Sequence, residues 1–112
     1  MEAKAIHRFA RIAPRKVRYV ADLIRGKDLN DALAILHFSP RAGAKVMGKV
    51  VLSALANAEH GGKVAVDNLY VKDVHVDEGP TMRRFRPRAM GRAYRIRKRT
   101  CHIHVVLDDE RD

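Results

Sequence analysis

The most constraining feature of this sequence is a strongly basic segment without carboxylates in its last third, from Gly79 to Leu107. Its central part, Arg83 to Arg99, holds nine cations, whereas the rest of the chain holds 14 basic and 13 acidic residues. Nine like charges repel one another, and neither alternating face of the segment is apolar enough to pack on a core. We therefore expect this segment to project from a nearly neutral body and to bind a polyanion.

The middle of the basic segment predicts a hairpin with a tight turn at Met90-Gly91. Gly91 can take the positive φ that such a turn requires. The expected cross-strand pairs are Phe85 with Ile96 and Arg83 with Lys98. A two-stranded ribbon is marginally stable alone in water, so we expect it to be ordered mainly by its ligand.

The composition of the ribbon favours nucleic acid as that ligand. Arg outnumbers Lys eight to one between residues 83 and 99, and its planar fork suits phosphate contacts. Phe85 and Tyr94 are interleaved with the cations and can stack on exposed bases. An acidic protein or a membrane surface would attract the same charge, but Pro87 and Gly91 interrupt any membrane-surface helix.

Three amphipathic segments of the body predict three helices. The first starts at Pro14 and closes at Gly26, the second is capped by Asp28, and the third runs from Ser39-Pro40 to Gly61-Gly62. Their apolar stripes, which we expect to be buried, are Val17, Val20, Ala21 and Ile24; Leu29, Ala32, Leu33 and Leu36; and Met47, Val50, Val51, Ala54, Leu55 and Ala58.

Alternating apolar residues predict the strands. Residues 3–12 suggest an edge strand, residues 64–77 are rich in β formers with an irregularity near Asp73, and a last strand starts at about Cys101. The predicted fold is α+β, with about three helices on a small, mainly antiparallel sheet and a long protruding β-hairpin. We expect one domain over residues 1–112, with a body at about 1–79 and 101–112 and the hairpin at about 80–100.

Global features indicate a cytosolic protein. Cys101 is the only cysteine, so an intrachain disulfide is impossible and a reducing compartment is expected. No apolar run approaches the roughly 18 residues of a membrane span, and the first 30 residues lack the apolar core of a signal peptide. We expect neither a membrane partner nor a homo-oligomer.

The first predicted helix begins with a cluster of cations, Arg15, Lys16 and Arg18. The helix dipole opposes cations at this end by about 0.3–1 kcal/mol each at exposed sites. An external anion would explain their placement, and so would a solvated face; the sequence leaves both readings open.

Metal and catalytic sites find little support. In Cys101-His102-x-His104 a strand would place Cys101 opposite the two histidines, which leaves two ligands where structural zinc needs four. Asp77 and Glu78 are adjacent and would point to opposite faces, so a metal-dependent nuclease using Asp73 and Asp77 is a weak alternative. We therefore expect no metal, no cofactor and no enzymatic activity. A DNA-architectural protein with Met90 as a wedge at its ribbon tip is the other alternative.

Several blocks resemble the bacterial ribosomal large-subunit protein L-twenty-two family, over residues 2 to 108. The blocks are Arg11-Ile-Ala-Pro-Arg-Lys-Val-Arg18, Leu23-Ile-Arg-Gly-Lys27, Ala56-Asn-Ala-Glu-His60, Glu78-Gly-Pro80 and Arg83-x4-Arg88-Ala-x-Gly91-Arg92-x9-His102-Ile103-x-Val105-x-Leu107. Met90 and Cys101 depart from the residues that are common there.

The resemblance implies a structural constituent of the large ribosomal subunit in the cytoplasm. Such a protein binds 23S rRNA and neighbouring ribosomal proteins, aids early subunit assembly, and lines the exit tunnel of the nascent peptide with its hairpin tip. The tip residues would be Arg88, Ala89, Met90, Gly91 and Arg92. The expected rRNA-binding residues are Arg8, Arg11, Arg15, Lys16, Arg18, Arg83, Arg84, Arg86, Arg95, Arg97, Lys98 and Arg99.

Overall fold

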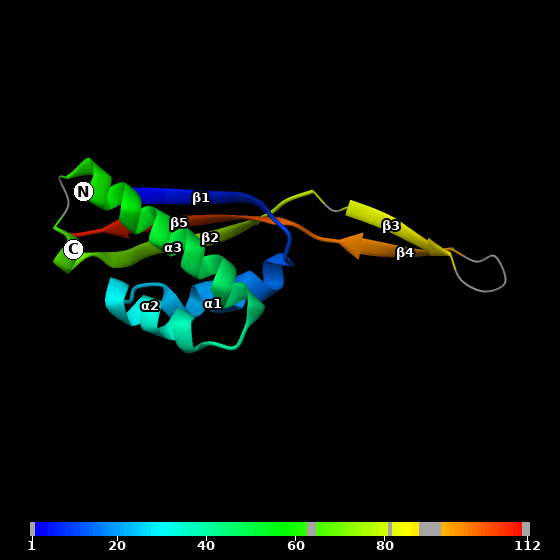
Figure 1. The fold of residues 1–112 in the computed structure, drawn as a ribbon, viewed down its shortest axis with the longest axis horizontal. Coiled ribbons are helices and arrows are strands. Elements are labelled where there is room, and N and C mark those ends of the chain that lie inside the picture. The colour runs from blue at the N-terminus through cyan, green and yellow to red at the C-terminus, as the bar shows by residue number, and fades with distance from the viewer. Residues whose placement is uncertain (1, 63–64, 81, 88–92, 111–112) are drawn as a thin grey trace.

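The computed structural model shows a body of three helices and a three-stranded sheet, from which a two-stranded hairpin projects (Figure 1). Residues 2–62, 65–80, 82–87 and 93–110 are described, with only the backbone described for 82–87 and 93–98. The molecule measures 63 × 25 × 22 Å, and the hairpin extends its longest dimension. The predicted α+β fold is confirmed.

The sheet of the body is antiparallel, with strand order β1-β5-β2. Strand β5 (Cys101–Asp108) is central, β1 (Glu2–Ala10) forms one edge, and β2 (Tyr70–Glu78) forms the other. The edge position predicted for the first strand is therefore confirmed. So is the irregularity near Asp73, because the β2–β5 register shifts between Val71 and Asp73.

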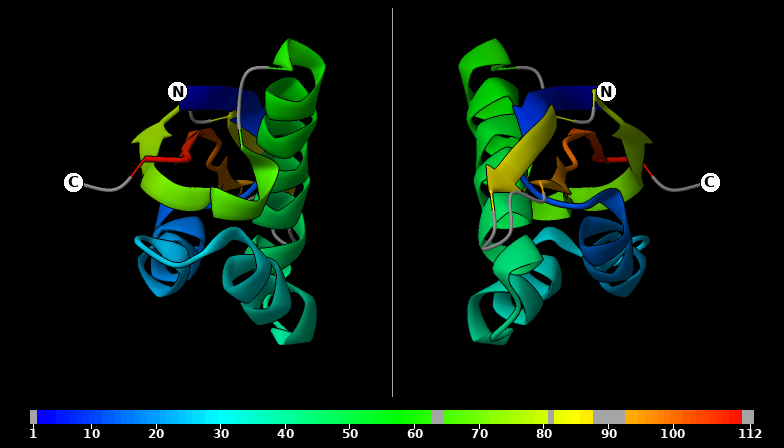
Figure 2. Two further views of the ribbon diagram at one scale, coloured as in Figure 1. Left: turned by 90° about the vertical axis from the view of Figure 1, so that its left-hand side faces the viewer. Right: turned by 90° about the vertical axis from the view of Figure 1, so that its right-hand side faces the viewer.

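All three helices cover one face of this sheet (Figures 1 and 2). Helix α1 (Pro14–Ile24) contacts β2, α3 (Ala42–Gly61) contacts β1 and β5, and α2 (Leu29–Phe38) packs on α1 and α3. Among the described residues, no helix combines the length and the apolar character of a membrane span.

The core lies between the helices and the inner face of the sheet. Cys101, Ile103, Val105 and Leu107 alternate along β5 and are fully buried there. The stripes predicted for the three helices also enter this core. Only Leu33 and Leu55 among them are partly rather than fully buried. The helical spacing of apolar residues thus identified the packing faces correctly.

The starts of two elements were predicted too early. Helix α3 begins at Ala42 with Arg41 as N-cap, because the Ser39 hydroxyl accepts a 3.4 Å hydrogen bond from the Arg41 N–H and forms a turn before the helix. Strand β2 begins only at Tyr70, because Val66–Asn68 forms a 3-10 turn. Asp and Asn favour such turns over strands.

The predicted register of the hairpin is wrong by one residue. Strand β3 (Met82–Pro87) pairs with β4 (Ala93–Lys98) so that Phe85 lies opposite Arg95 rather than Ile96, and Arg83 opposite Arg97. Pro87 has no N–H to extend the ladder, and the last pair is Pro87 with Ala93. An odd number of residues then connects the strands, which shifts the register from that of a two-residue turn.

Candidate nucleic-acid interface

The hairpin leaves the body at the point where three strand ends meet. Ala10, at the end of β1, and Glu78, at the end of β2, both pair with Cys101, the first residue of β5. The chain termini lie at the opposite end of the sheet (Figure 1). Residues near these strand ends therefore lie close to the root of the hairpin.

Thr100 closes the root of the hairpin. The Gly79 N–H donates a 2.9 Å hydrogen bond to the Thr100 carbonyl oxygen, and the Thr100 hydroxyl donates a 2.6 Å bond to the Pro80 carbonyl oxygen. Thr100 is only 5% exposed. Because these bonds join the two chain segments that enter the hairpin, they orient it on the body. Sequence reasoning missed this role, since one threonine carries no periodic signal.

Helix α1 begins at the same end of the body and presents cations there. Arg11, Arg15 and Lys16 are exposed, and they have no ion-pair partner among the residues that the structure describes. The first turn of α1 contains no acidic residue, and its N-cap, Ala13, provides no side-chain hydrogen bond. Pro14 has no N–H, and the Lys16 N–H donates a 3.1 Å hydrogen bond to the Ala13 carbonyl oxygen, so the unpaired cations are what favours anion binding at this helix start.

The start of α3 adds a cation that sequence reasoning did not select. A Cβ atom on Gly43 would lie 3.1 Å from the Lys16 carbonyl oxygen, so the start of α3 packs closely on α1. The Arg41 guanidinium lies 3.9 Å from the centre of the Tyr19 ring, which is half exposed. Tyr19 and Arg41 thus extend the basic surface of α1 with a cation–π pair.

Arg18 differs from its neighbours on α1 because it contacts the sheet. Its Nε and Nη2 atoms donate hydrogen bonds of 3.2 and 3.0 Å to the Val76 carbonyl oxygen on the edge strand β2. At the C-cap of α1, Arg25 donates a 2.6 Å hydrogen bond to the Val74 carbonyl oxygen. Both arginines donate hydrogen bonds to carbonyl groups that would otherwise lack a partner on this edge strand.

The remaining predicted cations lie at the same end of the molecule or in the hairpin. Arg8 is exposed on β1, and Arg99 is exposed beside the hairpin root. Arg83, Arg84 and Arg86 are positions of β3, and Arg95, Arg97 and Lys98 are positions of β4. The predicted tip, Arg88 to Arg92, lies outside the described residues.

The Cys-His-x-His sequence of β5 does not form a ligand cluster. Cys101 is buried in the core, and burial raises the pKa of its thiol although Arg18 opposes this. His102 faces the other way, and its Nδ1 accepts a 3.0 Å hydrogen bond from the N–H of Phe9. Phe9 has a φ of 59° where the β1–β5 register shifts, so His102 supports a strained backbone position. The predicted separation of Cys101 from the two histidines is confirmed.

Comparison with known proteins identifies the family. Residues 5–108 match the family described as "Ribosomal protein L22p/L17e". Two curated proteins from strains of Desulfitobacterium hafniense, each called "Large ribosomal subunit protein uL22", are 57% identical to the chain over 111 residues. These matches cover 99% of the chain and 97% of each relative. The chain therefore belongs to the ribosomal protein L22p/L17e family.

Proposed function

We propose that the chain is a non-enzymatic, structural protein of the large ribosomal subunit in the cytoplasm and that it binds 23S rRNA with one end of its body and its hairpin. The relatives' name supports the assignment to the large subunit. The proposal of rRNA binding is carried by one observation: the cation-rich start of α1 and the root of the basic hairpin lie at the same end of the molecule.

The chemistry of this surface suits the phosphate backbone of RNA. Arg11, Arg15 and Lys16 are exposed cations, and such side chains bind phosphate without reading base sequence. Tyr19 with Arg41 offers an aromatic face on which an unpaired base can stack. Folded RNA supplies both phosphates and splayed bases, so it fits this surface better than regular duplex DNA.

The hairpin has the properties of an element that RNA would stabilise. Its strands pair with each other and form a separate two-stranded sheet. The register places Arg83 opposite Arg97, and like charges at opposed positions destabilise a ribbon. Counter-charges from RNA remove this repulsion, so rRNA would order the hairpin during early subunit assembly. Residues 88–92 would then line the exit tunnel and meet the nascent peptide, and neighbouring ribosomal proteins would contact the body.

The test compares three alanine variants in the slope of log binding constant against log salt concentration, with a large-subunit rRNA fragment as ligand. Arg15→Ala and Arg84→Ala should each reduce the magnitude of the slope by about 0.7–0.9, as expected for one lost phosphate contact. Arg18→Ala is the matched control on the same helix. It should mainly lower the free energy of unfolding, because its guanidinium already donates to Val76.

Specificity is measured by competition at moderate salt. The proposal requires that unlabelled large-subunit rRNA displace the fragment more effectively than random RNA does. Equal displacement would contradict specific rRNA binding. Preferred binding of bent duplex DNA by a stable dimer would instead support the DNA-architectural alternative. If the slope is unchanged for both Arg15→Ala and Arg84→Ala, these side chains do not contact phosphate.

A further inference from the structure

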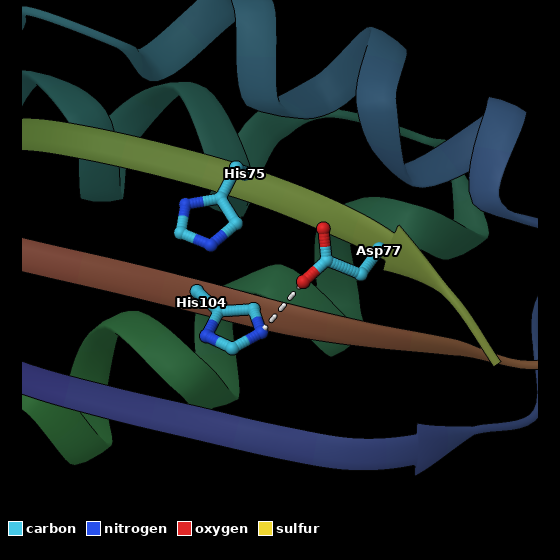
Figure 3. A group of neighbouring side chains, drawn as sticks. All are labelled: His75, Asp77 and His104. Carbon is cyan, nitrogen blue, oxygen red and sulfur yellow. Dashed lines mark ion pairs between the residues drawn. The ribbon is translucent and has the colours of Figure 1, made fainter.

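A cluster of two histidines and an aspartate lies on the sheet face opposite the helices (Figure 3). His75 and Asp77 come from β2 and His104 comes from β5. One potential ligand atom from each residue lies within 4.8 Å of the others. We propose that His75, Asp77 and His104 bind a Zn²⁺ ion that links β2 to β5. This inference rests on the sheet alone and is independent of rRNA binding.

The backbone register holds these residues together. His75 lies directly opposite His104 in the β2–β5 ladder, and Asp77 is two residues further along the same face of β2. Directly opposed side chains in antiparallel strands have Cβ atoms about 4.5–5.5 Å apart, so both imidazoles start within reach of a common ion. The structure records this proximity as stacked rings, with centroids 4.3 Å apart and an interplanar angle of 13°.

The carboxylates complete the arrangement. Asp77 Oδ2 lies 3.1 Å from His104 Nε2, close to the ligand–ligand separation of about 3.3 Å around tetrahedral zinc. Asp73 Oδ2 lies 3.2 Å from His75 Nδ1 and can fix the tautomer in which Nε2 is free to bind metal. A carboxylate that holds the second nitrogen of a metal-binding histidine is a common supporting interaction.

Charge and ligand type select the ion. With both imidazoles neutral, Asp73 and Asp77 give the cluster a charge of −2, which matches a divalent cation. Imidazole nitrogen is a preferred ligand for Zn²⁺ and other late first-row metals, whereas Mg²⁺ and Ca²⁺ prefer oxygen. Three protein ligands leave one position for water. The histidine side chains are 49% (His75) and 26% (His104) exposed, so the ion can enter from solvent.

Binding requires a modest movement of the rings. In-plane lone pairs of two stacked imidazoles do not converge, so at least one ring must tilt until both nitrogens face the same point. The strands need not move, because the ligands are already paired across the ladder. His102 lies opposite Asp77 in the same ladder, but its Nδ1 already accepts a hydrogen bond from the Phe9 N–H. The geometry therefore favours His75 and His104 as the metal-binding pair.

The experiment titrates the full chain, without a polyhistidine tag, with Zn²⁺ by calorimetry at a pH above the ordinary histidine pKa. One ion should bind per chain. His75→Gln and His104→Gln should each weaken binding at least about tenfold, and Asp73→Asn should also weaken it by about tenfold. His60→Gln, which removes an exposed histidine at the end of α3, is the matched control and should bind as the parent does.

Thermal melts separate binding from folding. In EDTA all variants should melt with the parent, whereas Zn²⁺ should raise the melting temperature of the parent and of His60→Gln only. Co²⁺ in place of Zn²⁺ should produce visible absorption that is lost in His104→Gln. Absence of a stoichiometric site in the parent would overturn the proposal. Equal weakening by His60→Gln would also overturn it, because adsorption would then be spread over surface histidines.

Discussion

Replacement of Gly79 by alanine tests whether Thr100 controls the root of the hairpin. A Cβ atom at position 79 would lie 2.5 Å from Thr100 Oγ1, 3.3 Å from the Thr100 carbonyl carbon and 3.4 Å from the Cys101 nitrogen. The first distance is shorter than any stable contact. The hydroxyl cannot move freely, because it donates the 2.6 Å hydrogen bond to Pro80.

The cost follows from what Thr100 must give up. Loss of its hydrogen bond costs about 0.5–1.5 kcal/mol, and displacement from its rotamer costs a similar ~0.5–1.5 kcal/mol. Alanine also lowers the conformational entropy of the unfolded chain, which offsets roughly 0.4–1 kcal/mol of this cost. We therefore expect Gly79→Ala to lower the free energy of unfolding by about 0.5–2 kcal/mol.

A double-mutant cycle, measured by urea denaturation, isolates the contact. Thr100→Ala removes the hydroxyl, so Gly79→Ala should cost less in that background, with a coupling energy of at least about 0.5 kcal/mol. Thr100→Val keeps an atom at the crowded position but cannot donate a hydrogen bond, so the cost of steric overlap should persist. If Gly79→Ala costs the same in the Thr100→Ala background as in the parent, the reasoning about this contact is refuted.

Three further predictions concern the body. Val50→Ala should lower the free energy of unfolding by about 0.5–3 kcal/mol in urea denaturation, because Val50 is 3% exposed; equal melts would exclude the core assignment of α3. Gly48→Ala should raise this free energy by about 0.5–1 kcal/mol, and Gly43→Ala by less, because only Gly43 is crowded by a backbone oxygen. Burial alone would raise the pKa of Asp108, but backbone N–H groups and Lys72 lower this pKa to about 2. Its stabilising effect should therefore be complete above its ordinary pKa and be lost as the pH falls to about 2, and Asp108→Asn should flatten stability across this acid range.

The helices and their buried faces could be predicted because packing imposes a period on many residues at once. A stripe such as Val17, Val20 and Ile24 has one interpretation when it is bounded by Pro14 and Gly26. Element starts depend on single hydrogen bonds. The Ser39 hydroxyl accepts a hydrogen bond from the N–H of Arg41, and α3 begins only after this turn. No periodic signal reveals whether a serine will cap a helix or form a turn before it.

The sequence predicted that a projecting hairpin exists, but it did not predict the register in which its strands pair. Charge repulsion and the lack of an apolar face indicated a projecting ribbon, and the structure contains one. The register depends on whether the connection has an even or an odd number of residues. In the structure Pro87 pairs with Ala93, so five residues connect the strands, whereas the turn predicted at Met90-Gly91 would need an even number.

The histidine cluster shows what sequence spacing cannot reveal about a site. His102 and His104 are two residues apart on β5, and their spacing predicted that they share one face but offer too few ligands for zinc. The partner of His104 is instead His75, which lies opposite it on β2. A ligand set made across strands depends on a register between segments far apart in the chain, and a bulge near Asp73 sets that register.

The cations of α1 divide into two groups for a reason that also lies in tertiary structure. Arg15 and Arg18 are the same residue type, one turn apart, and both were expected to bind RNA. The carbonyl groups of Val74 and Val76 point outward from the edge strand β2, and a bare edge invites pairing with another chain. Arg18 and Arg25 cover that edge. Arg15 and Lys16 are exposed and have no ion-pair partner among the described residues, so the same helix both protects the sheet and presents cations to the proposed RNA surface.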